Sequence, residues 1–406
     1  MPLLNTELER HRVTVEKLIY GGDALARIDG QAVFIPFALP GEEVEVRTSP
    51  GKGKSLRGLN TRVFSASAQR VQPGCEYFGH CGGCQYQHAD YAYQLEQKVA
   101  ILRETLARLG KITIEQEIPV IKSEPWGYRN RVKLHFERGK VGYREAELHK
   151  LCAIGHCPIS SPRLNAVIAA LNDAVKRREW PSFVSGLEVF TNETDVQFHV
   201  TETARPVAKR FFSWCAGIIP GFQPDSVTYE SSGQKLRISR GTFFQVNRFL
   251  IDPLVQEVMG DYEGRSAIDL YAGAGLFSLP LSRRFASLTA VERSAPAYHD
   301  LGYNAEQFGR SVTAIKTTSD EFLARFDGTA DLIVADPPRA GLTRTVTSSL
   351  LRIQSPRIII VSCDPATLAR DLESLSRAYA IRRIALIDLF PQTYHFETVV
   401  HLELKR

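Results

Sequence analysis

The segment S-A-I-D-L-Y-A-G-A-G, residues 266–275, decides the fold of the C-terminal part of the chain. Its apolar start is typical of a buried strand, and Gly273 and Gly275 let the following turn approach a ligand closely. A helical stretch comes next, and a second apolar run, L-T-A-V-E, ends at Glu292. An acid at that spacing can accept the hydroxyl groups of a ribose. The pattern predicts a nucleoside-bearing ligand at the carboxyl ends of parallel strands.

Three interpretations of this loop fit the residues. A dinucleotide site is one, but Ser278 stands where the third glycine of G-x-G-x-x-G would be. Two glycines followed by an acid instead fit the S-adenosylmethionine site of class I methyltransferases. An ordinary turn between strand and helix is the third, and the loop alone does not separate them.

Strands and helices alternate from about residue 240 to the C-terminus. This order predicts an α/β domain over residues 240–406 with a mostly parallel, doubly wound, Rossmann-like sheet. The last two strands lack a long helix between them, so we expect an antiparallel hairpin at one edge. The strand candidates are 266–270, 288–292, 312–316, 331–336, 357–362, 384–389 and 398–404.

The first 240 residues show a different pattern of secondary structure. Short strand-like runs and glycine turns predict a small OB-like β-barrel over residues 1–64. The last part of this barrel is basic, and it is either a solvated flexible loop or a surface that binds RNA phosphates. The basic residues are Arg47, Lys52, Lys54, Arg57 and Arg62. Residues 65–239 predict an α+β domain with an antiparallel sheet and helices over 91–110 and 162–176. The first helix could pack on the C-terminal domain, with Gly110 as its C-cap.

Composition sets broad limits on the function. A hydrophobic content of 44% and a charged content of 23% are ordinary for a folded protein. No run is long enough to span a bilayer, and the N-terminal M-P-L-L-N-T-E-L-E-R lacks a signal-peptide core. We therefore expect a cytoplasmic protein with reduced cysteines and no membrane. A net charge of +5 permits a nucleic-acid partner without requiring one.

Three cysteines, Cys75, Cys81 and Cys84, follow one another as C-x5-C-x2-C in a glycine-rich run. Such a run predicts a metal or cluster centre that needs a fourth ligand. Cys157 is the best candidate because a proline follows it, and Cys152 is its rival. A zinc site that includes His80 or His156 is the alternative. Cys215 carries no motif and is expected in the core.

Two further polar segments follow strands of the C-terminal domain. Asp336, in D-P-P-R-A-G, would lie at the ligand-binding edge of the sheet and could bond the imide N–H of a uracil. Cys363 ends the next strand, and Asp364-Pro365 after it predicts a capped helix start. The positive end of that helix is expected to lower the pKa of the thiol.

A thiolate at that position can attack C6 of a pyrimidine and make C5 nucleophilic enough to take a methyl group. Once methylated, C5 must lose a proton, so a base is required. Glu397 in F-P-Q-T-Y-H-F-E is the first candidate, with a pKa raised by its apolar neighbours, and His395 is the rival.

Together, the motifs at 243–247, 269–275, 336–341, 362–371 and 390–397 resemble those of the RNA 5-methyluridine methyltransferase family. The N-terminal G-G-D-A-L-A-R-I-D-G resembles the TRAM domain of many members. The resemblance implies that Cys363 is the nucleophile and Glu397 the proton acceptor. It places Gln245, Tyr271, Gly273, Gly275, Glu292, Asp320 and Asp336 around S-adenosylmethionine, with Asp336 also at the target base.

The same resemblance implies a [4Fe-4S] cluster on Cys75, Cys81, Cys84 and Cys157. One departure is Leu276, where related enzymes often carry Asn. Members with a cluster resemble the enzymes that act on 23S rRNA, which makes 23S rRNA the expected substrate and tRNA the alternative. Phe244 or Tyr394 is expected to help hold the extruded base. An RNA-binding assembly factor without catalysis is a further alternative, and no obligate protein partner is implied.

Overall fold

The computed structural model describes residues 10–146, 150–309 and 312–406. Most of the N-terminal stretch from which the lack of a signal peptide was inferred lies outside these residues. The chain divides into two compact units, each built from separate segments. The first comprises residues 1–101, 144–152 and 390–395, and the second comprises residues 102–143, 153–389 and 396–406. The finer division into 1–64, 65–239 and 240–406 stays a prediction.

The first unit contains a six-stranded sheet in the order β1-β5-β6-β4-β3-β2. Alternate residues point inward, so that Val33, Ile35, Val44 and Val46 are fully buried, as expected for a small barrel. The pairs are antiparallel except for β4 and β6. The strands are β1 (Arg10–Thr14), β2 (Lys17–Leu18), β3 (Asp23–Ile28), β4 (Gln31–Pro36), β5 (Glu43–Pro50) and β6 (Leu56–Ser65).

The basic run is mostly strand, and this corrects the flexible-loop interpretation. Arg47 lies in β5, while Arg57 and Arg62 lie in β6. The Arg57 guanidinium pairs with Asp23, and that of Arg62 lies 4.7 Å from the centre of the Phe64 ring. Only the turn between the two strands, with Lys52 and Lys54, lies outside the sheet.

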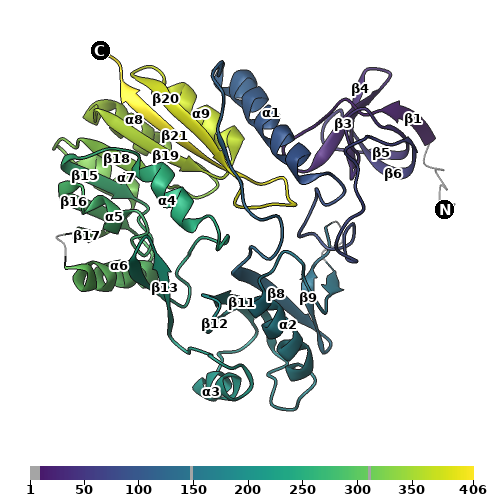
Figure 1. The fold of residues 1–406 in the computed structure, drawn as a ribbon, viewed down its shortest axis with the longest axis horizontal. Coiled ribbons are helices and arrows are strands. Elements are labelled where there is room, and N and C mark those ends of the chain that lie inside the picture. The colour runs from purple at the N-terminus through teal and green to yellow at the C-terminus, as the bar shows by residue number, and fades with distance from the viewer. Residues whose placement is uncertain (1–9, 147–149, 310–311) are drawn as a thin grey trace, which may run out of the picture. The chain divides into compact units, whose positions relative to one another are not determined.

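The second unit is built on an eight-stranded sheet in the order β17-β16-β15-β18-β19-β21-β20-β7. Apolar runs buried on both faces form its central strands, as expected for a mostly parallel sheet. Helices α4 to α9 lie along it (Figure 1). The strands are β7 (Val120–Ile121), β15 (Gly264–Leu270), β16 (Phe285–Glu292), β17 (Val312–Lys316), β18 (Leu332–Ala335), β19 (Arg357–Ser362), β20 (Tyr379–Ile387) and β21 (Glu397–Leu404).

The predicted hairpin is present, but it does not form the edge of this sheet. β20 and β21 pair in antiparallel fashion, and β21 pairs with β19 on its other side. β7 then adds to β20 in parallel, with Leu386 opposite Val120 and Ile387 opposite Ile121. A two-residue strand that precedes its partner by more than two hundred residues leaves no local signal.

A five-stranded sheet in the order β10-β9-β8-β11-β12 confirms the antiparallel pattern predicted before residue 240. Its strands are β8 (Arg131–Glu137), β9 (Lys140–Arg144), β10 (Leu151–Ala153), β11 (Val184–Thr191) and β12 (Val196–Thr203), and β13 (Ser226–Ser231) pairs with β14 (Gln234–Ser239). The helices are α1 (Tyr91–Gly110), α2 (Pro162–Ala174), α3 (Lys209–Ile218), α4 (Ile251–Met259), α5 (Ser278–Leu281), α6 (Ala295–Phe308), α7 (Ser319–Arg325), α8 (Arg344–Ile353) and α9 (Pro365–Leu375).

Gly110 has a different role from the C-cap that was predicted. It is the last residue of α1, and the left-handed conformation falls on Lys111 with φ 55°. A Cβ at Gly110 would lie 2.8 Å from the carbonyl oxygen of Ala369 in α9. Glycine is therefore needed because two backbones approach closely, which agrees with the expectation that this helix packs on the C-terminal domain.

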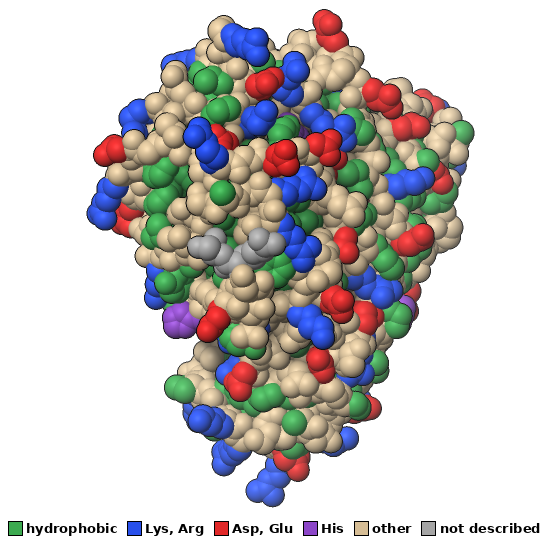
Figure 2. Space-filling view, turned by 60° about the vertical axis from the view of Figure 1, so that its left-hand side comes forward, with side chains coloured by type: hydrophobic (Ala, Val, Ile, Leu, Met, Phe, Trp, Pro, Cys, Tyr) green, Lys and Arg blue, Asp and Glu red, His purple; other side chains and the backbone are tan. Residues whose placement is uncertain are grey.

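No helix in the described part of the chain is long and apolar enough to cross a membrane. Figure 2 shows one face of the molecule, on which basic and acidic side chains are interspersed. On this face no large area carries charge of one sign alone.

Candidate active site

The carboxyl ends of three neighbouring parallel strands meet the start of β21 at one edge of the sheet. Leu270 pairs with Ala335, so Tyr271 and Asp336 leave adjacent strand ends together. Ser362 pairs with Thr398 on the antiparallel strand, so the next residues out, Cys363 and Glu397, face each other. Residues from four separate motifs are thereby brought to one place, as the sequence predicted.

Glu397 is buried, and burial raises the pKa of its carboxyl group well above the usual value. The charge of Asp336 raises that pKa further, and the charge of Arg339 lowers it. Its Oε2 atom is buried without a hydrogen-bond partner among the described residues. Burying a polar atom without a partner costs free energy, so the Oε2 atom of Glu397 is available for a hydrogen bond to a ligand. The raised pKa expected for Glu397 is confirmed.

Cys363 does not have the lowered pKa that was expected. Burial raises the pKa of its thiol to about 12, and the charge of Glu397 adds to the effect, whereas Arg339 opposes it. The helix start is capped as predicted, since the Asp364 carboxylate accepts the N–H groups of Ala366 (2.9 Å) and Thr367 (3.0 Å). Those donors are occupied by a carboxylate whose charge also raises the pKa of Cys363, so the helix does not favour the thiolate.

The glycine loop after β15 borders open space at Gly273. Tyr271, Gly273 and Gly275 have positive φ angles of 61°, 56° and 98°, and a Cβ at Gly273 would meet nothing within 4 Å. Glu292 lies beneath the loop and accepts the N–H groups of Gly273 (2.9 Å) and Ser294 (2.5 Å). A rigid turn with open space above it and a held carboxylate beside it fits a nucleoside-bearing cofactor such as S-adenosylmethionine.

Asp269 is a buried acid in this site to which the sequence assigned no role. Burial raises the pKa of its carboxyl group to about 7, and the charges of Asp336 and Glu292 contribute. The Ser278 hydroxyl donates to its Oδ2 atom at 2.5 Å. Ser278, the residue that departs from the dinucleotide pattern, thus makes a hydrogen bond to strand β15.

Gln245 and Asp320 are the remaining predicted cofactor residues. Gln245 is buried and lies in the segment that connects β14 to α4. In this segment the carbonyl groups of Thr242 and Phe244 accept hydrogen bonds from Arg131 at 2.7 Å and 3.3 Å. Asp320 lies in the first turn of α7, where its carboxylate accepts the Thr343 hydroxyl. Burial raises the pKa of Tyr271 to about 12, and the charge of Asp320 contributes. The sequence carried no signal for the Arg131 contacts.

Phe244 does not face a ligand, which corrects one expectation. Its ring is buried in the core, 4.9 Å from the ring of Tyr229 and 5.9 Å from that of Phe190. Its neighbour Phe243 is 66% exposed. The two adjacent aromatic residues therefore have opposite environments.

His395, the alternative base, and Tyr394 belong to the first unit. Their ring centres lie 4.0 Å apart, and the Tyr20 ring lies 5.3 Å from Tyr394 and 6.3 Å from His395. The roles of His395 as the alternative proton acceptor and of Tyr394 as a contact for the target uracil stay predictions.

Of the predicted cluster cysteines, Cys75, Cys81 and Cys84 lie in the first unit and are half-buried. The chain wraps tightly there, since the N–H of Cys81 donates to the Tyr77 carbonyl at 2.9 Å. Cys152, in the same unit, has a hydrogen bond with Cys81. The described side chains include no group of three or more His, Cys, Asp or Glu residues arranged to hold a metal ion. The donor chemistry fits a cluster, but the cluster stays a prediction.

Cys157 lies in the second unit, where Asn165 holds both its N–H (2.8 Å) and its carbonyl group (3.0 Å). His80 and His156, the alternative zinc ligands, are exposed. Cys215 is fully buried in α3 and belongs to the core, as predicted.

Known proteins resemble the chain along nearly its whole length. Residues 235–405 match the tRNA (uracil-5-)-methyltransferase family, and residues 6–59 match the TRAM domain. An uncharacterized RNA methyltransferase of Aquifex aeolicus is 32% identical over 97% of this chain and 98% of its own. The chain belongs to the RNA (uracil-5-)-methyltransferase family. This enzyme is therefore an RNA (uracil-5-)-methyltransferase that depends on S-adenosyl-L-methionine.

Further relatives of the methyltransferase support the same fold. The 23S rRNA (uracil(1939)-C(5))-methyltransferase RlmD of Cronobacter sakazakii is 32% identical over 96% of this chain and 95% of its own. The crystal structure of Pyrococcus abyssi tRNA (uracil-54, C5)-methyltransferase, in complex with S-adenosyl-L-homocysteine, has a TM-score of 0.77 and 23% identity. It covers 97% of the methyltransferase described above and is itself covered completely. The TRAM domain and the α/β methyltransferase fold predicted from the sequence are thus confirmed.

Proposed function

We propose that this enzyme methylates C5 of a uridine in 23S rRNA through a covalent intermediate between Cys363 and C6 of the base. The observation that supports this most strongly is the arrangement of Cys363 at the end of β19 opposite Glu397 at the start of β21, with Asp336 on the adjacent strand end. A nucleophile and a base on facing strands can act on neighbouring atoms of one ring.

In the proposed reaction, the thiol proton of Cys363 is released to water and the sulfur bonds to C6. The electron pair of the C5–C6 double bond then makes C5 nucleophilic. When bound, S-adenosyl-L-methionine would supply the methyl group that C5 takes, and it would leave as S-adenosyl-L-homocysteine. Glu397 removes the proton from C5, the double bond re-forms, and the bond between C6 and Cys363 breaks to return the thiolate.

The charges around the site agree with these roles. Arg339 opposes the burial that keeps the Cys363 thiol protonated, and the raised pKa of Glu397 makes its carboxylate a stronger base than an exposed one. Burial also raises the pKa of Asp336 to about 7. Asp336 can accept the imide N–H of a uracil when it is ionised.

We assign the cofactor to the loop between β15 and α5. Glu292 would hold the ribose hydroxyls, Asp320 would reach the adenine, and Tyr271, Gly273, Gly275 and Gln245 would line the remainder. At Leu276, where the family resemblance implies Asn, the side chain packs against a core cluster that includes Ala274. At the target base, the exposed Phe243 replaces the buried Phe244 as the candidate aromatic contact.

The choice of 23S rRNA rests on the relatives at about 30% identity that are named for that substrate. A tRNA substrate is the alternative, and the Pyrococcus abyssi enzyme is named for one. A [4Fe-4S] cluster on Cys75, Cys81, Cys84 and Cys157 is also proposed, on the basis of the cysteine motif and the tight backbone wrap around Cys81.

The decisive experiment offers 5-fluorouridine-substituted 23S rRNA fragments and tRNA in parallel, with S-adenosyl-L-methionine. Fluorine at C5 cannot be removed as a proton, so we expect a denaturation-resistant complex with 23S rRNA that Cys363→Ala abolishes. On unmodified RNA, Glu397→Gln should slow release of the intermediate by about 10²–10⁴-fold and let the complex accumulate.

No complex with either RNA would contradict the covalent mechanism, and a complex with tRNA alone would contradict the substrate. A protein that binds both RNAs without transferring a methyl group would support a non-catalytic role instead.

A further inference from the structure

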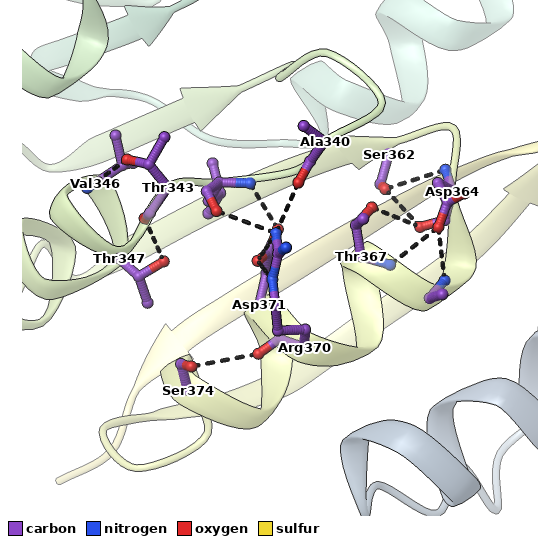
Figure 3. Close-up of polar contacts among 12 residues, drawn as sticks. Ala340, Thr343, Val346, Thr347, Ser362, Asp364, Thr367, Arg370, Asp371 and Ser374 are labelled. Carbon is purple, nitrogen blue, oxygen red and sulfur yellow. Dashed lines mark hydrogen bonds and ion pairs between the residues drawn. The ribbon is translucent and has the colours of Figure 1, made fainter.

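The turn between β18 and α8, residues 339–342, is bonded through its backbone to helix α9 (Figure 3). The Arg370 guanidinium donates to the carbonyl groups of Ala340 (2.8 Å) and Leu342 (3.1 Å). The Asp371 carboxylate accepts the N–H of Leu342 at 2.8 Å. The Thr367 hydroxyl adds a bond to the carbonyl of Arg339 at 3.3 Å. Every residue of the turn except Gly341 is thus tied to α9 by a main-chain group.

Thr367, Arg370 and Asp371 form what we call the α9 clamp. Their i, i+3, i+4 spacing places them on one face of the helix. Arg370 also bonds Asp371 through Nε (3.0 Å) and Nη2 (2.8 Å), so one guanidinium joins the buried carboxylate to two carbonyl groups. A planar fork of donors suits such a bridge, whereas a lysine ammonium does not.

Gly341 lets the turn approach the clamp. It has φ 73°, and a Cβ there would lie 2.5 Å from Asp371 Oδ2 and 2.6 Å from Arg370 Nη2. No other residue fits this position without displacing the clamp. The glycine of D-P-P-R-A-G and the R-D that ends S-C-D-P-A-T-L-A-R-D are therefore two halves of one contact.

The clamp joins the two segments that carry the proposed chemistry. One end of the turn leads back to Arg339 and Asp336, which follow β18. The helix begins directly after Cys363 and Asp364, which follow β19. Because β18 and β19 are adjacent parallel strands, the clamp determines how far the turn that carries Arg339 lies from the helix that follows Cys363.

We propose that Arg370 and Asp371 are positioning residues, which hold the 339–342 turn against α9 so that Arg339 stays beside Cys363 and Glu397. This inference rests on the proposed role of Cys363. Among the described residues, the charges of Glu397, Asp336 and Asp364 disfavour the ionisation of that thiol, whereas the charge of Arg339 favours it. Release of the turn removes the favourable charge and leaves the three unfavourable ones.

The test compares Arg370→Lys and Asp371→Asn with Ser374→Ala in the full-length enzyme. Ser374 lies one turn further along α9, where its hydroxyl donates to the carbonyl of Arg370 (3.3 Å), so loss of this hydroxyl leaves the clamp intact. The first readout is the pH dependence of Cys363 alkylation by iodoacetamide, followed on the peptide that contains Cys363 by mass spectrometry. The others are complex formation with 5-fluorouridine RNA, S-adenosyl-L-methionine affinity and the thermal transition.

For both clamp variants we expect the alkylation profile to move to higher pH and complex formation to slow by about 10- to 100-fold, as for a small displacement of a catalytic group. Cofactor affinity should match that of Ser374→Ala. The proposal is overturned if the clamp variants have the same alkylation profile as Ser374→Ala. It is also overturned if their loss of activity is proportional to a loss of cofactor affinity. If Asp371→Asn does not fold, Arg370→Lys decides, because it keeps the charge. Alkylation needs no RNA, so a failure of the clamp and a failure of the proposed function are distinguishable.

Discussion

Asp269 shows how one buried carboxyl group links the cofactor loop to stability. Its Oδ2 atom accepts the Ser278 hydroxyl, while its Oδ1 atom is buried without a hydrogen-bond partner among the described residues. Folding raises the pKa of the Asp269 carboxyl group from 3.8 to about 7. Between these pH values the folded protein keeps a proton on Asp269 that the unfolded chain releases. Stability from Asp269 is therefore present below pH 4 and is lost as the pH rises towards 7.

Replacing Asp269 by Asn should remove this dependence. We expect Asp269→Asn to gain thermal stability relative to the wild type on going from pH 5 to pH 8, because the amide never becomes charged. Asp331→Asn is the matched control. The Asp331 carboxylate accepts the N–H groups of Arg265 (2.7 Å) and Ser266 (3.1 Å), which lower its pKa, so this variant should show no such gain. Calorimetric transition temperatures at both pH values measure the difference, and equal shifts for the two variants would contradict the assignment.

At the scale of elements, α1 contacts α9, the helix that follows Cys363. α1 comes from the part of the chain before residue 240, outside the C-terminal α/β domain. The close approach of Gly110 to Ala369 leaves no room for a methyl group. Arg103 supports this end of α1 by donating to the carbonyl of Gln116 at 2.6 Å. The segment after α1 then leads to β7, which completes the sheet.

Gly110→Ala should therefore reduce the free energy of unfolding by about 1–3 kcal/mol through overpacking. Gly217→Ala in α3 is the control, because a Cβ there would meet nothing within 4 Å. Alanine should stabilise that helix by about 0.5–1 kcal/mol. Urea unfolding of both variants gives the comparison, and a neutral Gly110→Ala would show that the two helices can separate at no cost.

At the scale of the whole molecule, three of the four proposed cluster ligands, Cys75, Cys81 and Cys84, belong to the first unit, whereas Cys157 and the cofactor loop belong to the second. Cys81 lies in the first unit, while Tyr271, Gly273 and Glu292 lie in the second. The cofactor loop follows β15 of the eight-stranded sheet, whose strands contain none of these four cysteines, so loss of the cluster should leave the folding of the cofactor loop intact. A structural cluster would then matter for RNA affinity rather than for cofactor affinity.

Cys81→Ser should lower the iron and sulfide content of anaerobically purified protein and weaken RNA binding, with S-adenosyl-L-methionine affinity unchanged. Calorimetric titration and filter binding measure the two affinities. Cys215→Ala removes a thiol from the core of α3 and should keep the iron. Retention of both iron and RNA affinity in Cys81→Ser would contradict the proposed cluster.

Local sequence rules predicted much of this fold. β17 and β19 have the bounds expected from their apolar runs, and Asp364 caps α9 as its place before Pro365 indicated. The glycine loop and its acid, Glu292, were also recognisable, because close backbone approach requires glycine at particular positions. These features depend on residues within a few positions of one another, so the sequence alone determined them.

The rest depends on contacts between distant segments, which only the tertiary structure decided. Whether Phe243 or Phe244 is exposed depends on the core around Phe190. The pKa of Cys363 is raised rather than lowered because burial and the facing Glu397 outweigh the helix start. β7 and the α9 clamp join segments that no periodicity connects. Side-chain periodicity reports which face of an element is buried, whereas the charge state of a site depends on every group that folding brings around it.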